Sequence, residues 1–453
     1  MHKEIYNLYN MSIINIFWFR RDLRLHDNAG LYHALKSGYP ILPIFIFDDQ
    51  ILNKLSNRHD ARVSFIYKTI LELKAQIQLA GSDLEVFYGT PHKIWLDIIS
   101  KYKINAVYFN HDYESYALKR DSNVKLLLEN NSINCFTYKD HVIFEKEEVI
   151  KDDGRPYTVF TPYKKKWLAN LTKSSPITKS YYLKSYPSAA LIHKFLSFNS
   201  KNKVPTLLEM GFIKSELSFP SIEINQSVIK SYDQNRDFPS ISGTSKLGIH
   251  FRFGTISIRQ KALKASYLNE TYLSELIWRD FYAMILFHFP HIEHSSFRPE
   301  YDQIEWRNDE NEFSCWCEGN TGYPIVDAGM RELKATGFMH NRVRMITASF
   351  LTKHLLIDWR WGEQWFANHL LDFDLASNNG GWQWAAGCGT DAAPYFRIFS
   401  PAAQTEKFDK NQTYIKKWVP SYGTDKYPKP IVEHTTARER CLITYKNGLN
   451  RGK

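Results

Sequence analysis

The sequence predicts two domains of different fold class: an α/β domain built on a doubly wound, Rossmann-like parallel sheet, and an all-helical domain after a long linker. Between residues 12 and 143, short apolar runs such as SIINIFWF and YPILPIFIF alternate with segments of helical spacing. Strands that are apolar throughout and separated by helices are typical of a parallel sheet covered on both faces. From Gly254 to about Trp418, nearly every stretch has helical spacing and strand-like alternation is absent. These patterns predict an α/β half followed by an all-α half.

Each element of the first half follows from an apolar segment, taken in chain order. The run SIINIFWF predicts the first strand, DNAGLYHALKSG the helix after it, and YPILPIFIF the second strand. A long helix follows, because apolar residues recur at helical spacing from Val63 to Ile77. DLEVFYG then predicts a strand, PHKIWLDIISKY a helix and NAVYFNHDY another strand. The chain has no GxGxxG, which counts against a nicotinamide enzyme built on this half.

The composition changes between residues 144 and 231, where Lys, Ser, Pro and Asn are abundant. Segments such as LTKSSPITKSYYLKSYPS favour turns over any periodicity, so we interpret residues 144–231 as an interdomain linker. Residues 1–11 lack an apolar pattern and end at a second methionine, which predicts an N-terminal extension with Met1 or Met11 as the start. The α/β domain is therefore expected at 12–143 and the helical domain at 232–453.

Composition limits the partners and the compartment. The formal charge of +10 and the pI near 9.0 favour an acidic polymer such as nucleic acid, although a merely basic enzyme has the same balance. The five cysteines are scattered and predict neither a disulfide framework nor a metal site, so we expect a reducing cytoplasm. No apolar run approaches the roughly 20 residues that span a bilayer, so we expect no membrane insertion.

The stretch NNGGWQWAAGCGTDAAPYFRIF, residues 378–399, sets two tryptophans beside a double glycine. Glycine destabilises a helix interior by about 1 kcal/mol and lets the backbone approach a neighbour closely. The composition therefore predicts the wall of a ligand site rather than an ordinary helix.

Two further segments place polar and aromatic residues on helices. In TYLSELIWRDFYAMILF, Glu275, Trp278 and Arg279 share one helix face, where they form either a ligand surface or an ion pair beside a core tryptophan. MHNRVRMITASF carries Asn341, Arg342, Arg344 and Met345 after a helix stop at Thr336 and Gly337. These arginines either contact phosphates or lie on a solvated face.

Two shorter motifs offer polar groups to a ligand. Asp372 and Asp374 flank Phe373, where they accept hydrogen bonds from sugar hydroxyls or cap a helix. GTSKLG, residues 243–248, offers hydroxyls and amides ahead of a helix, an arrangement that holds a phosphate or simply caps the helix. The chain has no GxSxG, no Walker motif and no HExxH.

Taken together, these motifs identify the chain as a member of the photolyase and cryptochrome family, and within it the chain resembles the class I cyclobutane pyrimidine dimer photolyases. The resemblance runs from Trp18 to Tyr427. It is most specific in GTSKL, ELIWRDFY, TGYPIVDAGMRELKATGFMHNRVRMITASF, LLIDWRWGE and DFDLASNNGGWQWAAGCGTDAAPYFRIFSP. It implies an α/β antenna domain, a linker, and a helical domain that holds FAD above a DNA-binding hole.

The resemblance also implies the cofactor contacts. Thr244 and Ser245 would hold the pyrophosphate, and Asn378 would face the reactive nitrogen of the flavin ring. Plant cryptochromes tend to place Asp there, so the resemblance favours a stable, fully reduced flavin. The implied FAD contacts are Tyr232, Thr244, Ser245, Lys246, Leu247, Gly248, Glu275, Arg344, Asp372, Asp374 and Asn378.

The implied reaction is light-driven repair of DNA. Excited reduced FAD passes an electron to a flipped-out pyrimidine dimer, the cyclobutane ring splits, and the electron returns; Glu275 would stabilise the dimer's radical anion while Trp278 and Trp384 stack on the lesion. Arg236, Arg279, Asn341, Arg342, Met345 and Gln404 match positions that contact the lesion, its backbone or the pocket. Trp382, Trp359 and Trp306 match a relay that re-reduces the flavin.

The partner implied is UV-damaged DNA, and we expect a monomer, associated with the nucleoid if the chain is bacterial. The alternatives are a cryptochrome-type photoreceptor, a 6-4 photoproduct photolyase, and a single-strand binding module with a vestigial flavin. The chain has one imidazole, His340, where 6-4 enzymes have two, and it ends shortly after Trp418 without a long tail of the signalling type.

Three positions depart from the family's pattern. Phe338 stands where close relatives have Trp, and Gly248 where many have Ser. Ala117 replaces the glutamate of folate-binding members, so the second chromophore is left open between a deazaflavin, a second flavin and an empty site.

Overall fold

The computed structural model describes residues 12–173 and 182–451, and these divide into two compact units. The described residues of the first unit are 12–143, 182–219 and 250–263. Those of the second are 144–173, 220–249 and 264–451. The expected N-terminal extension, residues 1–11, lies outside the described residues.

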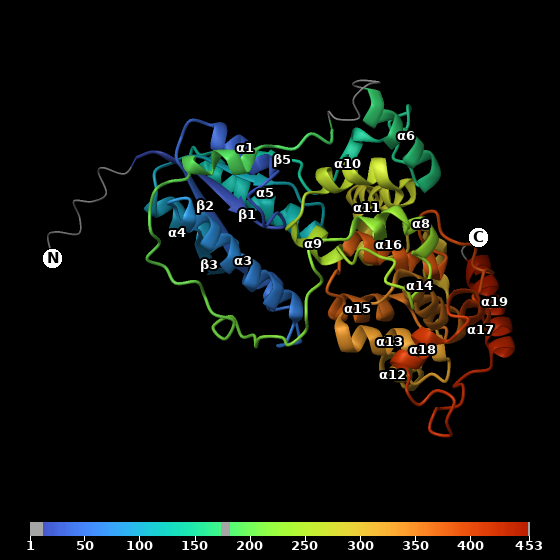
Figure 1. Ribbon diagram of the computed structural model, residues 1–453. Coiled ribbons are helices and arrows are strands. Elements are labelled where there is room, and N and C mark those ends of the chain that lie inside the picture. The colour runs from blue at the N-terminus through green and yellow to red at the C-terminus, as the bar shows by residue number, and fades with distance from the viewer. Residues whose placement is uncertain (1–11, 174–181, 452–453) are drawn as a thin grey trace. The chain divides into compact units, whose positions relative to one another are not determined.

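The first unit contains a five-stranded parallel sheet in the order β3-β2-β1-β4-β5 (Figure 1). Its strands are β1 (Ile14–Phe19), β2 (Ile41–Asp48), β3 (Glu85–Gly89), β4 (Ile104–Asn110) and β5 (Asn134–Tyr138). Every neighbouring pair is parallel, and the strand order reverses between β1 and β4. The doubly wound sheet predicted from the apolar runs is therefore confirmed.

Helices cover both faces of this sheet. The helices that follow the strands are α1 (Ala29–Lys36), α2 (Asp49–Leu52), α3 (Ala61–Leu79), α4 (Pro91–Lys101) and α5 (Ser115–Asn130). Trp18 of β1 packs with Trp95 of α4 and Val124 of α5 on one face. Phe47 of β2 meets Tyr67 of α3 on the other. Strands β1, β2 and β4 are therefore buried on both sides, which explains their continuous apolar runs.

The amino end of α1 is closed by side chains of the first unit itself. The backbone N–H of Ala29 donates to Asp140 (3.1 Å), that of Gly30 to Asn110 (2.9 Å) and that of Leu31 to Asn28 (3.1 Å). In dinucleotide-binding folds these N–H groups hold a pyrophosphate. The absence of GxGxxG agrees with the structure. The N–H groups that such a motif would offer to a pyrophosphate already donate to side chains of the protein.

A buried ion network joins distant segments of the first unit. Arg259 pairs with Asp27 (3.0 Å) and Asp140 (2.8 Å), and Arg24 also pairs with Asp140 (2.8 Å). Burial alone would raise the pKa of Asp140, but the two arginines outweigh it and lower this pKa to about 2.

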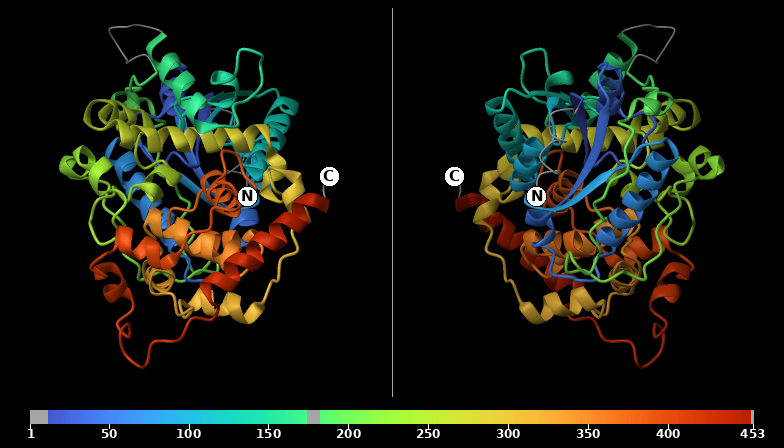
Figure 2. Two further views of the ribbon diagram at one scale, coloured as in Figure 1. Left: turned by 90° about the vertical axis from the view of Figure 1, so that its right-hand side faces the viewer. Right: turned by 90° about the vertical axis from the view of Figure 1, so that its left-hand side faces the viewer.

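The second unit is helical, as predicted. Helix α11 (Glu270–His288) runs beside α16 (Leu375–Ala386), and the two can be followed in Figure 2. The segments α9 (Gly248–Phe253) and α10 (Ile258–Leu268) each span a boundary between the units. The other helices of the second unit are α6 (Phe160–Lys173), α7 (Gln226–Lys230), α8 (Tyr232–Asn235), α12 (Glu310–Glu318), α13 (Pro324–Thr336), α14 (Asn341–Ser349), α15 (Trp359–His369), α17 (Pro401–Phe408), α18 (Thr413–Trp418) and α19 (His434–Arg451).

Residues 144–231, interpreted from sequence as a linker, are divided between the two units. The segment contains α6, whose Tyr163, Trp167 and Leu171 are buried at intervals of four residues. Three lysines fill the positions between Tyr163 and Trp167 and hide this apolar stripe from an interpretation of composition alone.

Within the described ranges, no helix has both the length and the hydrophobicity needed to cross a membrane. The five cysteines are free thiols. In the same part of the chain, no three His, Cys, Asp or Glu side chains gather closely enough to hold a metal ion.

Candidate functional site

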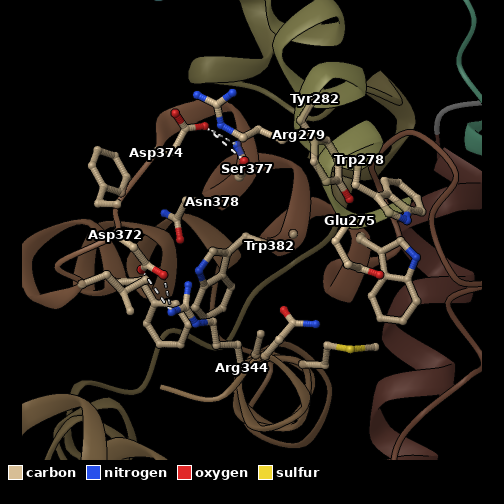
Figure 3. Close-up of a pocket in the computed structure, with 18 of the residues that line it drawn as sticks. Glu275, Trp278, Arg279, Tyr282, Arg344, Asp372, Asp374, Ser377, Asn378 and Trp382 are labelled. Carbon is tan, nitrogen blue, oxygen red and sulfur yellow. Dashed lines mark hydrogen bonds and ion pairs between the residues drawn. The ribbon is translucent and has the colours of Figure 1, made fainter. Parts of the chain in front are cut away.

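A cavity of about 430 Å³ lies within the second unit, between α11, α14 and α16 (Figure 3). It brings together many of the residues that the sequence singled out: Arg236, Glu275, Trp278, Arg279, Asn341, Arg344, Met345, Asp372, Asp374, Asn378, Trp382 and Trp384. Its other walls are Tyr282, Ala348, Phe366, Leu370, Phe373, Ser377 and Gly381.

Helix α11 supplies one wall of the cavity. The helix begins where the Asn269 side chain accepts a hydrogen bond from the Tyr272 N–H (3.0 Å). Its buried stripe leaves Glu275, Trp278 and Arg279 on the cavity side, as the spacing predicts. Figure 3 shows Glu275 and Trp278 across the cavity from Asn378.

Glu275 forms an ion pair with Arg236, a residue that follows α8. An ion pair within the helix is one of the alternatives that the sequence leaves open, but the partner of Glu275 comes from a different segment. Burial raises the pKa of the Glu275 carboxyl, and Arg236 opposes this shift without cancelling it.

Helix α14 supplies a second wall. His340 caps this helix, since its Nδ1 accepts a hydrogen bond from the Arg342 N–H (3.2 Å). Arg344 donates through one nitrogen to both carboxylate oxygens of Asp372, each at 3.0 Å. Arg342 instead pairs with Asp237 (2.7 Å) and is absent from the cavity wall.

Helix α16 includes residues 378–386, so the prediction that this stretch avoids ordinary helix is wrong. Asp374 caps the helix by accepting from the Ser377 N–H (3.2 Å). The helix tolerates its double glycine because close packing requires one of the two: a Cβ on Gly380 would lie 2.2 Å from the Tyr282 ring. A Cβ on Gly381 would meet no atom within 4 Å, and this residue lines the cavity.

Asn378 is held in one orientation by a residue that sequence reasoning missed. Its Nδ2 donates to the Oε1 atom (2.7 Å) and the backbone oxygen (3.2 Å) of Glu363. This leaves Oδ1 to accept a hydrogen bond from a group in the cavity. Burial raises the pKa of Glu363 although the bond from Asn378 opposes it. Glu363 ends the motif LLIDWRWGE, which could have drawn attention to it.

The segment 243–248 lies beside Asp372 and α11. Ser245 Oγ accepts from the Tyr272 hydroxyl (3.2 Å), and the Tyr232 and Tyr272 rings meet edge to face. A Cβ on Gly248 would lie 2.5 Å from the Cβ of Asp372, so a larger residue at this position would require a shift of Asp372. Thr244 and Ser245 are half-buried, Leu247 is buried, and Lys246 lies over the Phe338 ring at 5.0 Å.

The three tryptophans of the expected relay lie at different depths. Trp382 lines the cavity and, like Trp359, is 2% exposed. Neither indole N–H has a hydrogen-bond partner in the described part of the chain. Trp306 is half-buried, and its ring meets that of Tyr445 edge to face at 5.8 Å. Gln404, expected at the DNA surface, lies on α17 outside the cavity wall.

The donor set of the cavity fits a flavin dinucleotide. Gly381 offers open space to a flat ring, Asn378 offers a fixed acceptor, and Arg344 of α14 forms a polar clamp with Asp372. An α/β unit and a helical unit with this cavity define a two-domain flavoprotein.

Comparison with known proteins identifies the family. Residues 15–180 match the family model described as DNA photolyase, and residues 272–424 match the FAD binding domain of DNA photolyase. The deoxyribodipyrimidine photo-lyase of Alkalihalophilus pseudofirmus is 36% identical, over 96% of this chain and 98% of that protein. The enzyme of the same name from Escherichia coli is also 36% identical, over 95% of this chain and 98% of that protein.

Solved structures agree with these relatives. A bacterial class III photolyase from Agrobacterium tumefaciens superposes with a TM-score of 0.82 at 32% identity, covering 96% of this chain and 98% of that one. An archaeal photolyase from Sulfolobus tokodaii with two FAD molecules gives 0.78 at 34% identity, covering 96% and 100%. A Synechocystis cryptochrome shares the fold at 24% identity. The chain therefore belongs to the DNA photolyase family, and its helical unit carries that family's FAD-binding domain.

Proposed function

We propose that the chain is a deoxyribodipyrimidine photo-lyase, which uses light to split cyclobutane pyrimidine dimers in DNA. The observation that carries the proposal is a single cavity with Asn378 and Asp372 on one side and Glu275 and Trp278 on the other. The first pair suits a flavin, and the second suits two crosslinked pyrimidines. When bound, reduced and excited by light, FAD supplies the dimer with an electron and takes it back.

Residues on the cofactor side hold and orient the flavin. Asn378 presents its amide oxygen in a fixed direction, because Glu363 occupies the amide nitrogen. An acceptor in this place favours a flavin whose ring nitrogen carries a proton. Arg344, Asp372 and Asp374 provide polar groups around the ring and its side chain, and Thr244 and Ser245 provide hydroxyls for the pyrophosphate. Tyr232, Lys246, Leu247 and Gly248 complete the proposed cofactor contacts.

Glu275 is proposed to donate a hydrogen bond to the dimer, and its raised pKa supports this role. Burial raises the pKa of this carboxyl, so its protonated form, which donates a hydrogen bond to a pyrimidine oxygen that gains negative charge, persists to higher pH than in an exposed glutamate. Arg236 sits at the same carboxyl and adds positive charge where the negative charge develops.

Aromatic rings and cations hold the flipped lesion. Trp278 and Trp384 line the cavity and offer ring faces for stacking, which stabilises an unstacked base by about 1–3 kcal/mol. A crosslinked pair of pyrimidines pairs poorly and costs less to extrude than an intact base. Arg279, Asn341, Arg342, Met345 and Gln404 complete the proposed lesion and backbone contacts.

The three relay tryptophans provide a route for re-reducing the flavin. Trp382 borders the cavity, Trp359 is buried, and Trp306 reaches partial exposure. We propose that electrons enter at Trp306 and reach the cofactor through Trp359 and Trp382.

His340 disfavours 6-4 photoproduct repair by this chain. Its Nδ1 caps α14, and burial followed by the charge of Arg344 lowers its pKa to about 4. A neutral imidazole committed to a helix cap is a poor proton donor at neutral pH. Cyclobutane dimers are therefore the substrate that the site favours.

Residues 12–143, which carry the sheet of the first unit, are proposed as an antenna domain, with residues 144–231 linking it to a helical domain at 232–453. Ala117, which replaces a glutamate of folate-binding relatives, is buried in α5. The closed amino end of α1 disfavours a pyrophosphate there, so a second flavin would need a different anchor.

The family identity implies binding to UV-damaged DNA. We propose further that the chain acts as a monomer, which size-exclusion chromatography with light scattering tests. An enzyme that repairs DNA works where the DNA lies, so we propose the cytoplasm, and the nucleoid if the chain is bacterial.

Repair assays on defined lesions test the proposal. The FAD-loaded, reduced chain is incubated with a duplex carrying one cyclobutane thymine dimer, or one 6-4 photoproduct, in darkness and under blue light. We expect intact thymines to return only from the cyclobutane dimer and only in light. Failure in light would exclude the enzyme and leave a photoreceptor or a simple DNA-binding protein.

A further inference from the structure

Phe160 begins helix α6 and stacks on Trp278 although it does not line the cavity. The two rings are nearly parallel, with an interplanar angle of 6° and centroids 3.7 Å apart. A ring at this distance leaves no room for a base on the same face. The Tyr282 ring also stacks on Trp278, with centroids 5.4 Å apart and an interplanar angle of 28°, so a ligand reaches the indole only where neither ring covers it.

Three contacts fix the place of Phe160. Its ring is 8% exposed and meets the Phe281 ring edge to face at 5.9 Å. Its backbone N–H, which begins a helix and has no carbonyl partner within it, donates to Asp391 Oδ2 (3.4 Å). Asp391 adopts a left-handed conformation (φ 49°), in the loop that follows Trp384.

Helix α6 is itself anchored on α11, the helix that carries Trp278. Trp167 donates from its indole N–H to Asp280 (3.0 Å), and Lys164 pairs with Glu270 (3.1 Å). Phe160 therefore reaches Trp278 from a rigid base rather than from a mobile loop.

We propose that Phe160 is a positioning residue for lesion recognition: it covers one face of Trp278 and fixes the orientation in which the indole meets the extruded dimer. The inference rests on the proposed function, because it assigns a role to Trp278 in holding the lesion. Without the Phe160 ring, the indole gains rotational freedom, and part of the stacking energy is spent on ordering it.

The test compares DNA affinities of the full-length, FAD-loaded chain in the dark. Binding is measured by fluorescence anisotropy on a duplex with one cyclobutane thymine dimer and on the undamaged duplex. We expect Phe160→Leu to reduce the preference for the dimer five- to tenfold while affinity for undamaged DNA changes less than twofold. Phe160→Tyr keeps the ring and should stay within twofold of the original chain.

Phe144→Leu is the matched control. Phe144 is buried, and its ring meets Trp167 of α6 edge to face at 5.3 Å, so this change removes a comparable contact from the same helix without touching Trp278. Loss of thermal stability should be similar in Phe144→Leu and Phe160→Leu, with dimer preference reduced only in the second.

A double-mutant cycle completes the test. In a Trp278→Ala background, Phe160→Leu should have no further effect on dimer preference, because it acts through the indole. The inference is overturned if Phe160→Leu keeps the preference, if Phe144→Leu or Phe160→Tyr loses it equally, or if the effect persists without Trp278. An original chain with no preference for the dimer would instead contradict the proposed function, and the inference with it.

Discussion

Glu275 shows how one side chain in the cavity depends on a distant partner. The spacing of Glu275, Trp278 and Arg279 predicts their common helix face, and the structure agrees. The pairing of Glu275 with Arg236 was not predictable, because Arg236 approaches from a segment with no periodic relation to α11. Spacing along a chain constrains neighbours on one helix and says little about which segments meet.

Substituting Glu275 tests its proposed hydrogen bond to the dimer. Loss of a hydrogen bond that involves a developing charge costs about 1.5–3 kcal/mol, so Glu275→Ala should lower the repair yield per absorbed photon roughly tenfold or more. The yield is measured with saturating dimer duplex, so that weaker binding does not contribute. Glu275→Gln still donates a hydrogen bond and should retain much more activity than alanine.

The same residue predicts a pH dependence. The pKa of Glu275 is raised, so the protonated carboxyl persists above the usual range and is lost as pH rises through that raised value. Repair yield should therefore fall with rising pH in the original chain. The Glu275→Gln variant cannot titrate and should show no such fall, and an identical pH profile in both would contradict the assignment.

Glu363 is expected to act through Asn378. Glu363→Leu removes the side-chain acceptor at 2.7 Å and leaves only the backbone oxygen at 3.2 Å, so Asn378 gains freedom to turn and its oxygen is held less firmly. Reduced FAD should reoxidise in air several-fold faster, which absorbance spectroscopy follows directly. Glu363→Gln keeps an acceptor oxygen and should reoxidise nearly as slowly as the original chain.

At the level of elements, the strands and the cavity helices α11 and α14 were predictable, whereas α6 and α16 were not. Apolar runs predicted all the central strands, and helical spacing with a glycine stop predicted α13 and α14. Helix α6 is hidden by its lysines and α16 by its glycines, and the need for Gly380 is visible only once Tyr282 is seen to pack against it. In both cases tertiary packing overrides the local composition.

The two glycines of α16 predict opposite effects of alanine. Gly380→Ala places a Cβ against the Tyr282 ring, and overpacking of this kind costs about 1–3 kcal/mol of unfolding free energy. Gly381→Ala meets no protein atom and gains up to about 1 kcal/mol of helix propensity, but it narrows the cavity. Urea unfolding of the FAD-free chains should separate the two variants. Gly381→Ala should bind FAD more weakly despite equal or higher stability, and a Gly381→Ala chain that binds FAD normally would argue against this wall as the flavin contact.

At the level of the whole chain, residues far apart in sequence complete each unit. Residues 250–263 follow the cofactor segment yet belong to the sheet-containing unit, where Arg259 meets Asp27 and Asp140. Changes of composition along the sequence cannot show that residues 250–263 return to the sheet-containing unit. Buried ion pairs between distant segments leave no periodic pattern in the sequence. The resemblance to photolyases, by contrast, predicted most of the residues that line the cavity. A family resemblance implies which distant residues meet in space, whereas spacing along the chain does not.

Arg259→Gln should strongly destabilise the first unit. It leaves buried Asp27 without a cation and Asp140 with Arg24 alone, and breaking a buried pair in this way costs about 3–5 kcal/mol. Chemical unfolding at neutral pH measures the loss. The pKa of Asp140 lies near 2, below its unfolded value, so its contribution is present above pH 4 and disappears as pH falls toward 2. The difference between the original chain and Arg259→Gln should shrink over that range, and a constant difference would contradict the network.

The central claim is that one cavity of the helical unit holds both the flavin and the dimer. The most direct measurement is the fluorescence lifetime of bound, reduced FAD with and without a dimer-containing duplex under anaerobic conditions. Electron transfer to a dimer in contact with the flavin should shorten this lifetime, whereas an undamaged duplex should leave it unchanged. A lifetime that does not respond to the dimer, although the duplex is bound, would contradict the account.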